Sequence, residues 1–150
     1  MIQSVYIAGP LRGDQFSDSR TQAAHEDANI NDVMKVAQLL LDVHLRPHIP
    51  HFNSFLNKLR PRTLETWLEI DFYWLGRCDC MYRMPGKSQG ADAEEKMAVD
   101  WGLMIYNNIE RLIQSWGKCP NCKSDLTTHL TCRMCRKQWK IHNYQITSVN

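Results

Sequence analysis

The sequence has no apolar run that approaches the roughly 20 residues of a transmembrane helix. Residues 1–5 lack the charged segment and the long apolar segment of a secretory signal peptide. The glycine spacings typical of dinucleotide-binding turns and P-loops are also missing. We therefore expect a cytoplasmic protein without a membrane partner, in which the six cysteines do not form structural disulfides.

The composition indicates a folded protein with two unequal parts. Of the 150 residues, 43% are hydrophobic and 23% are charged, which fits one medium domain with a small appendage. Residues 1–116 hold 12 Lys and Arg against 15 Asp and Glu, whereas residues 117–150 hold 6 against 1. The net charge thus changes from −3 to +5 close to where the last four cysteines begin. We predict one domain at 1–116 and a second at 117–150.

The first part alternates strand-like and helical patterns. Apolar runs predict strands at 3–8, 46–50, 78–83 and 103–106. Apolar spacings of three and four predict helices at 29–44, from Thr63 onward, at 89–101 and at 108–116. The polar residues 14–28 have little periodicity and are predicted to form a loop or an irregular helix start. The alternation predicts an α/β fold: a Rossmann-like or flavodoxin-like parallel sheet with helices on both faces.

Two turns are predicted to meet at one edge of this sheet. Ligands of parallel sheets bind beyond the carboxyl ends of the strands, and the turns at 9–13 and 85–90 both follow strands. A turn with glycine and serine before a helix offers N–H groups and a hydroxyl to an anion. Arg12 and Ser88 are therefore candidate phosphate ligands, and Glu94 and Asp71 are candidate sugar-facing carboxylates.

Each of these residues also has a structural interpretation. Ser88 fits the N-cap of the following helix, and Arg12 fits a solvated side chain in a tight turn. Glu94 and Asp71 fit surface carboxylates on helices. Their shared placement at one sheet edge favours the ligand-binding interpretation for the group.

Other chemistry-bearing residues are assigned mainly to structure. His48 is expected to satisfy a buried polar position, while His51 stays open between a structural and a ligand-binding role. Cys78 and Cys80 are too few for a tetrahedral metal site and are expected to be small core residues.

Four motifs follow one another between residues 2 and 107. They are Val5-Tyr6-Ile7-Ala8-Gly9-Pro10, Pro50-His51, Asp71-x-x-Trp74-Leu75-x-x-Cys78-Asp79 and Ser88-x-Gly90-Ala91-x-x-Glu94-x-x-x-Ala98-x-x-x-Gly102. In this order they resemble the nucleoside 2-deoxyribosyltransferase-like superfamily, and most of all its phage branch of unknown function.

The resemblance implies roles for individual residues. In the catalytic relatives, a glutamate at the place of Glu94 attacks the anomeric carbon, and an aspartate at the place of Asp71 assists. In relatives that hydrolyse deoxynucleoside monophosphates, a serine at the place of Ser88 binds the 5′-phosphate. An enzyme of this kind would be an N-glycosidase or a 2-deoxyribosyltransferase with Glu94 and Asp71 as its catalytic residues. The ligand-binding residues expected from the loops and the resemblance together are Tyr6, Gly9, Pro10, Leu11, Arg12, Gly13, Asp71, Ser88, Gly90, Ala91 and Glu94.

The phage branch implies a second function, which we favour. Its characterised members resemble sponges: they bind cyclic ADP-ribose-type immune signals, and in some cases cyclic dinucleotides, without cleaving them, and so disarm bacterial Thoeris defence. This implies a small nucleotide ligand, a homo-oligomer and a location in the host cytoplasm. The polar stretch 14–27 departs from the transferase pattern and is interpreted as a lid or an oligomer contact.

The C-terminal segment carries the most specific local motif. Nine residues separate Cys119-Pro120-Asn121-Cys122 from Cys132-Arg133-Met134-Cys135. Each C-x-x-C turn supplies two thiolates, and four complete a tetrahedral Zn²⁺ site with no open position. We predict a structural zinc ribbon at 117–150, because about 34 residues are too few to fold on a core alone. His129 and His142 are less regularly placed alternative ligands.

The basic character of this segment leaves a third function open. Its cationic side chains, together with Trp139 and Tyr144, are of the types that contact nucleic acid. A stabilising appendage or an oligomer contact is the favoured interpretation of the ribbon.

Overall fold

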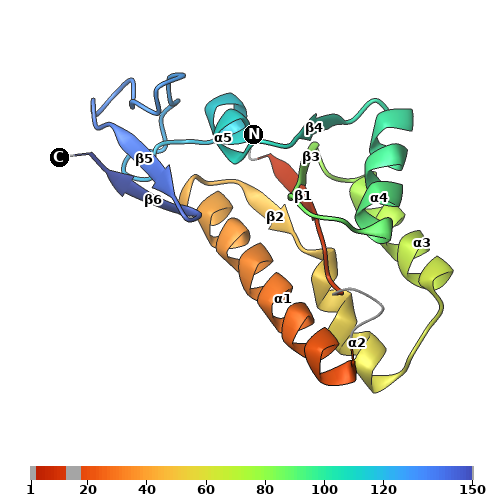
Figure 1. Ribbon diagram of the computed structural model, residues 1–150. Coiled ribbons are helices and arrows are strands. Elements are labelled where there is room, and N and C mark those ends of the chain that lie inside the picture. The colour runs from red at the N-terminus through yellow and green to blue at the C-terminus, as the bar shows by residue number, and fades with distance from the viewer. Residues whose placement is uncertain (1–2, 13–17, 150) are drawn as a thin grey trace.

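The computed structural model describes residues 3–12 and 18–149. Strands β1 (Ser4–Ala8), β2 (Arg46–His48), β3 (Cys80–Arg83) and β4 (Met104–Tyr106) form a parallel sheet (Figure 1). Their order is β2-β1-β3-β4, which matches the first four strands of the flavodoxin-like order. The predicted α/β class with a parallel sheet is confirmed.

Helices cover both faces of this sheet, as predicted. Helices α1 (Ser19–Asp42) and α5 (Ile109–Trp116) pack on the face that holds Val5 and Ile7. Helices α3 (Leu64–Leu75) and α4 (Gln89–Asp100) pack on the face that holds Tyr6 and Ala8. Because successive side chains of a strand point to opposite faces, β1 contributes to both layers of the core.

Helix α1 is longer than the sequence patterns indicated. Residues 14–28 were predicted to be a loop or an irregular helix start, but from Ser19 onward they form regular helix. Asp18 caps the helix by accepting hydrogen bonds from the N–H groups of Arg20 and Thr21, both at 3.0 Å. The first buried residue of α1 is Ile30, so its early turns are largely solvated and carry no apolar stripe.

Most other elements lie where they were predicted, with small differences at their ends. Thr63 caps α3 by accepting from the Thr66 N–H at 3.3 Å. The sequence did not reveal the short 3-10 turn Pro50–Phe52 or helix α2 (Asn53–Leu59). Strand β3 begins at Cys80, so Cys78 lies before it rather than on it.

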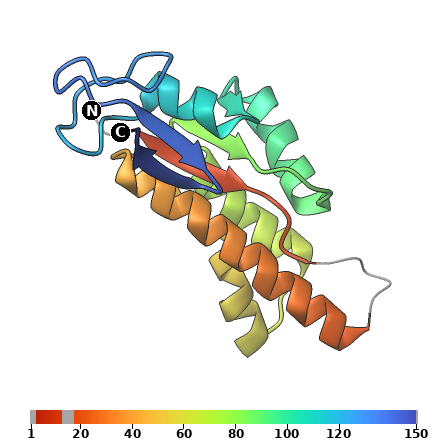
Figure 2. The ribbon, with the colours of Figure 1, turned by 60° about the vertical axis from the view of Figure 1, so that its left-hand side comes forward.

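The C-terminal segment packs against the α/β part instead of standing apart from it. It ends in an antiparallel hairpin of β5 (Trp139–His142) and β6 (Gln145–Ser148), which lies beside α1 (Figure 2). Side chains of this segment, Cys119, Leu126 and Leu130 among them, join the same core cluster as α1 and α5. The Lys118 N–H also donates to the Val43 carbonyl at 2.8 Å. The division at 116–117 remains a prediction.

Among the described residues, no helix combines the length and the apolar character needed to cross a lipid bilayer.

Gly86 provides a test of the contact between the two loops at the sheet edge. It has a φ of +116°, and an added Cβ would lie 2.6 Å from Pro10 Cγ. Gly102 also has a positive φ, +70°, but its Cβ would meet nothing within 4 Å. We expect Gly86→Ala to lower the free energy of unfolding by about 1–3 kcal/mol more than Gly102→Ala, because only the first adds overpacking to backbone strain. Urea unfolding of both variants measures this, and equal losses would contradict the contact.

Candidate functional site

The loops after β1 and β3 meet at the carboxyl edge of the sheet, as the sequence predicted. Ala8 and Arg83 are register partners in the last paired positions of these strands. The Met84 N–H continues the ladder by donating to the Ala8 carbonyl at 2.8 Å. A Cβ on Gly9 would lie 3.0 Å from Met84 Cβ, so the glycine is needed for loop packing. This edge is also where the strand order reverses, between β1 and β3.

A buried cluster of three acidic groups lies behind these loops. Glu94 in the second turn of α4 is only 5% exposed, and Asp71 on α3 is 9% exposed. The Tyr6 hydroxyl donates to Glu94 Oε1 at 2.8 Å. Asp71 Oδ1 accepts from Asn53 Nδ2 at 2.8 Å. The surface interpretation of both carboxyls is therefore wrong, because α3 and α4 turn them inward to face each other and Tyr6.

Burial raises the pKa of both carboxyls. For Glu94 the main cause is loss of solvent, followed by the charge of Asp71, while the Tyr6 hydrogen bond acts in the opposite direction. For Asp71 burial is again the main cause, opposed by hydrogen bonds with Asn53 and Glu94. The two carboxyls also interact with each other, so they lose their protons as a pair. Burial also raises the pKa of Tyr6, so its hydroxyl stays a donor.

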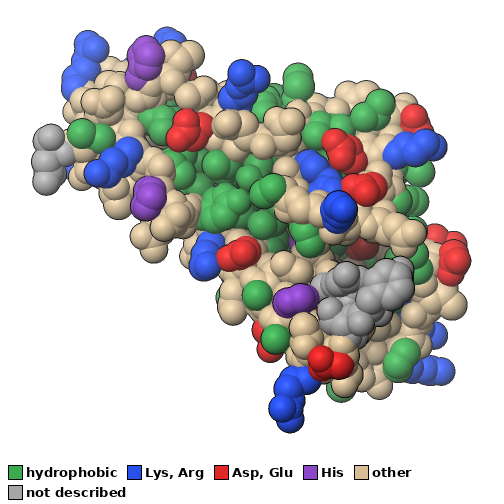
Figure 3. Space-filling model, in the orientation of Figure 1, with side chains coloured by type: hydrophobic (Ala, Val, Ile, Leu, Met, Phe, Trp, Pro, Cys, Tyr) green, Lys and Arg blue, Asp and Glu red, His purple; other side chains and the backbone are tan. Residues whose placement is uncertain are grey.

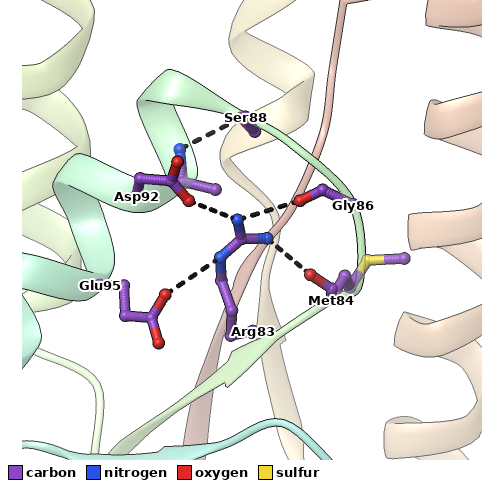
Figure 4. Close-up of polar contacts among 7 residues, drawn as sticks. Arg83, Met84, Gly86, Ser88, Asp92 and Glu95 are labelled. Atoms are coloured by element: carbon purple, nitrogen blue, oxygen red, sulfur yellow. Dashed lines mark hydrogen bonds and ion pairs between the residues drawn. The ribbon is translucent and has the colours of Figure 1, made fainter.

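Arg83 holds the loop between β3 and α4 in place (Figure 4). Its Nη1 donates to the Met84 carbonyl at 2.6 Å, and its Nη2 donates to the Gly86 carbonyl at 3.1 Å. Nη2 also pairs with Asp92 Oδ1 at 2.6 Å, and Nε lies 3.4 Å from Glu95 Oε2. From the sequence, Arg83 was expected only to end a strand. Its partners lie one to three and nine to twelve residues away, so only the turn of the chain into α4 reveals this role.

The start of α4 has the groups expected of an anion site. Ser88 Oγ accepts from the Ala91 N–H at 3.2 Å, so the N-cap interpretation is confirmed. The amides of residues 89 and 90 belong to the first turn, whose N–H groups have no partner within the helix. Among residues 3–12 and 18–149, no atom lies within 4 Å of a Cβ built on Gly90, so these residues leave space there. Phosphate binding by Ser88, Gly90 and Ala91 stays a prediction.

The loop after β1 is held by neighbouring helices. The Pro10 carbonyl accepts from His51 Nε2 at 3.1 Å, and the Leu11 carbonyl accepts from Asn29 Nδ2 at 3.0 Å. Arg12 is exposed, which leaves its guanidinium accessible to a phosphate. Gly13 lies outside the described residues.

Two histidines support the site from the side of β2. His51 is 3% exposed, and because a carbonyl only accepts, its Nε2 carries the proton. Its buried Nδ1 has no hydrogen-bond partner in the part of the chain that the structure describes. Burial lowers the pKa of His51 and of His48. His48 stacks between Tyr6 and Trp74, with ring centroids 5.4 Å and 5.2 Å apart. The structural role expected for His48 is thus an aromatic stack that supports Tyr6. The stacking role of Trp74 was not foreseen.

Asp79, the other acid near α3, has a purely structural contact. It accepts from the N–H of Ser4 at 2.7 Å and from its hydroxyl at 2.8 Å, which fastens β1 to the start of β3.

The four C-terminal cysteines come together as the spacing predicted. The sulfurs of Cys119, Cys122, Cys132 and Cys135 all lie within 4.8 Å of one another. Four thiolates bound to one Zn²⁺ at about 2.3 Å would lie about 3.8 Å apart, so the cluster has the size to hold a metal ion. The N–H groups of Met134 and Cys135 point at Cys132 Sγ at 3.4 Å and 3.3 Å, which is favourable for a thiolate.

Comparison with known proteins finds similarity among solved structures. No family model matches the chain, and no curated protein matches it either. The chain is similar to a solved structure, the 2-deoxyribosyltransferase from Leishmania mexicana, with 19% identity and a TM-score of 0.44. The match covers 69% of this chain and 61% of that one, less than two thirds of its length. A likeness of this degree identifies no functional residue here.

The acidic cluster predicts a specific dependence of stability on pH. Both carboxyls have raised pKa values in the folded state, so between the unfolded and folded values the native protein binds more protons. Their contribution is complete below the unfolded pKa near 4 and is lost as the pH rises through the folded values. The free energy of unfolding of the wild type should fall between about pH 5 and about pH 9. We expect this fall to be smaller in Glu94→Gln, by at least about 1.4 kcal/mol.

Urea unfolding at both pH values measures this difference. Glu69→Gln, at an exposed position of α3, is the control, and its free energy of unfolding should change with pH as in the wild type. If Glu94→Gln showed the same pH dependence as the wild type, the proton would not be held by this cluster.

Proposed function

We propose that this protein binds a nucleotide-type ligand at the carboxyl edge of β1 and β3 and holds it without cleaving it. The observation that carries the proposal is the buried cluster of Tyr6, Glu94 and Asp71 directly behind the two loops. Two buried carboxyls reduce the stability of a fold, so a cluster of this kind is typical of a functional site.

The first turn of α4 is the proposed phosphate site. Backbone N–H groups and the positive end of the helix dipole attract an anion. Ser88 and the open space at Gly90 lie at this turn, and the exposed Arg12 belongs to the facing loop. Arg83 fixes the intervening loop through two of its carbonyls, so the site is organised before a ligand arrives.

The carboxyl pair is the proposed sugar site. Glu94 and Asp71 offer both an acceptor and, when protonated, a donor, which suits the hydroxyls of a ribose. A carboxyl that keeps its proton near neutral pH is a poor nucleophile. This favours holding the ligand over attack on its anomeric carbon.

The resemblance to the phage branch supplies the ligand class. We propose that the ligand is a cyclic ADP-ribose-type signal or a cyclic dinucleotide, and that the protein is a phage sponge acting in the host cytoplasm against Thoeris defence. Exposed apolar side chains on α2 and α3 support the expected homo-oligomer. They are Phe55, Leu56, Leu59, Leu64 and Ile70.

A nucleotide N-glycosidase is the second candidate, and the complete acidic set favours it. In that reaction an ionised Glu94 forms an ester with C1′ as the C–N bond breaks and the base leaves with a proton. Water then hydrolyses the ester, or a second base replaces it in a transferase. The reaction requires Glu94 to lose its proton when the substrate binds.

One experiment separates the two candidates. The protein is incubated with cyclic ADP-ribose isomers, cyclic dinucleotides and deoxynucleoside monophosphates, then heat-denatured, and the released compounds are identified by mass spectrometry. We expect intact ligand in about equimolar amount with protein. Free base that accumulates with turnover, and that disappears in Glu94→Gln, would establish the enzyme instead.

Gly90→Ala tests the position of the phosphate. The new Cβ meets no protein atom within 4 Å, and Ala in a helix is more stable than Gly by about 0.5–1 kcal/mol. We therefore expect an equally or more stable protein that binds the recovered ligand at least about tenfold more weakly, as measured by calorimetry. Unchanged affinity would place the phosphate elsewhere.

We further propose that the cysteine cluster binds one structural Zn²⁺. The four sulfurs fit a closed site, which leaves no position for a substrate. The apolar residues of the ribbon pack into the core of the α/β part, which supports a stabilising appendage over a nucleic-acid module.

Metal analysis of purified protein should give one zinc per chain. We expect Cys132→Ser to lose the metal and to lower the melting temperature, because a ribbon of this size folds with its metal. Cys78→Ser, which alters a cysteine outside the cluster, is the control and should retain one zinc. Full metal content in Cys132→Ser would contradict the site.

A further inference from the structure

An open cavity lies where the C-terminal hairpin meets the sheet. It has a volume of about 550 Å³, within the usual range for small-molecule sites. The loop after β3, the start of α5 and Tyr144 at the tip of the hairpin line it. Figure 3 shows hydrophobic side chains gathered between the hairpin and α4, with acidic and basic side chains on the α4 side. The hairpin contributes Tyr144 to the lining, and the α/β part contributes the other lining residues.

Tyr144 reaches the cavity from a strained backbone position. His142 pairs with Gln145, so Asn143 and Tyr144 form a two-residue turn with φ values of +47° and +57°. Such turns favour Asn followed by Gly, because a side chain at the second position is strained. A tyrosine there costs about 1–2 kcal/mol relative to glycine. Backbone strain is often retained where the side chain has a function, and the strained Tyr144 lines a cavity.

The remaining lining has the chemistry of a site for a planar heteroaromatic group. Tyr144 and Ile109 are half-buried and supply apolar surface, and Tyr144 supplies the aromatic ring, because Tyr82 and Met84 are only 3% and 7% exposed. Asn107 supplies a side-chain amide, whereas the amide oxygen of Asn108 already accepts from the Arg111 N–H at the start of α5. Arg83 and Glu95 add charged groups to the lining. Aromatic rings stack on nucleobases, and an asparagine amide pairs with the edge of adenine through two hydrogen bonds.

We propose that this cavity is a second ligand site, which binds a purine base or nucleoside between the α/β part and the hairpin. It is distinct from the Glu94 cluster. Tyr82 packs with α1 and α5, whereas Tyr6 packs in the core cluster of α3 and α4. The two sites both adjoin the loop after β3 and helix α4, whose Glu95 lines the cavity and whose Glu94 belongs to the acidic cluster.

Adenine is the probe for this site, because it has the purine ring but neither a phosphate for α4 nor a ribose for the carboxyl pair. Its binding to the full-length, metal-analysed protein is measured by calorimetry or by NMR titration. Tyr144→Gly is the test variant, since glycine suits the positive φ and keeps the turn. Thr147→Ala, at an exposed position of the same hairpin, is the matched control. Glu94→Gln reports on the other site.

We expect saturable adenine binding by the wild type, weakened at least about tenfold by Tyr144→Gly and unchanged by Thr147→Ala. Because adenine has no ribose, Glu94→Gln should also bind it as the wild type does. A thermal melt confirms that Tyr144→Gly is folded. Absence of saturable binding by the wild type would overturn the proposal. Binding retained in Tyr144→Gly, or lost in Glu94→Gln, would overturn it as well, because the base would then lie elsewhere. Neither result depends on whether the acidic cluster binds a nucleotide, since the heat-release experiment decides that separately.

Discussion

The parallel pairing of β1 with β3 is the constraint on which the rest of this structure depends. Their register brings Ala8 opposite Arg83, so the two following loops must leave the sheet together. The loops then pack so closely that glycine is required at positions 9 and 86. Because β1 also pairs with β2, this edge is where the strand order reverses, and the candidate site lies there for a topological reason.

The same pairing sets the chemistry behind the loops. Tyr6 points from β1 to the face that α3 and α4 cover, and these helices present Asp71 and Glu94 to it. Burial raises the pKa of both carboxyls, and a carboxyl that keeps its proton can donate as well as accept a hydrogen bond. A proton held in this way suits binding of sugar hydroxyls more than attack on a sugar. The acids are thus the chemical link between the fold and the proposed sequestering function.

The C-terminal segment packs into the core of the α/β part. Its four cysteines gather at one point, and the segment buries apolar side chains on the face shared by α1 and α5. Tyr144 at the tip of the hairpin lines a cavity together with the loop after β3 and the start of α5. A strained Tyr144 at this tip connects the ribbon with the sheet edge that carries both candidate sites.

The sequence by itself determined the features that depend on local pattern. Alternating apolar runs predicted the parallel α/β fold, and the paired C-x-x-C turns predicted the cysteine cluster, because both follow from spacing along the chain. The early turns of α1 were missed since they are solvated and carry no apolar stripe. Tertiary structure alone decided that Glu94 and Asp71 are buried together, that Arg83 secures the loop, and that Tyr144 reaches the sheet. These depend on which helix faces which strand, a relation that single residues do not encode, because burial and proximity arise only when distant segments pack.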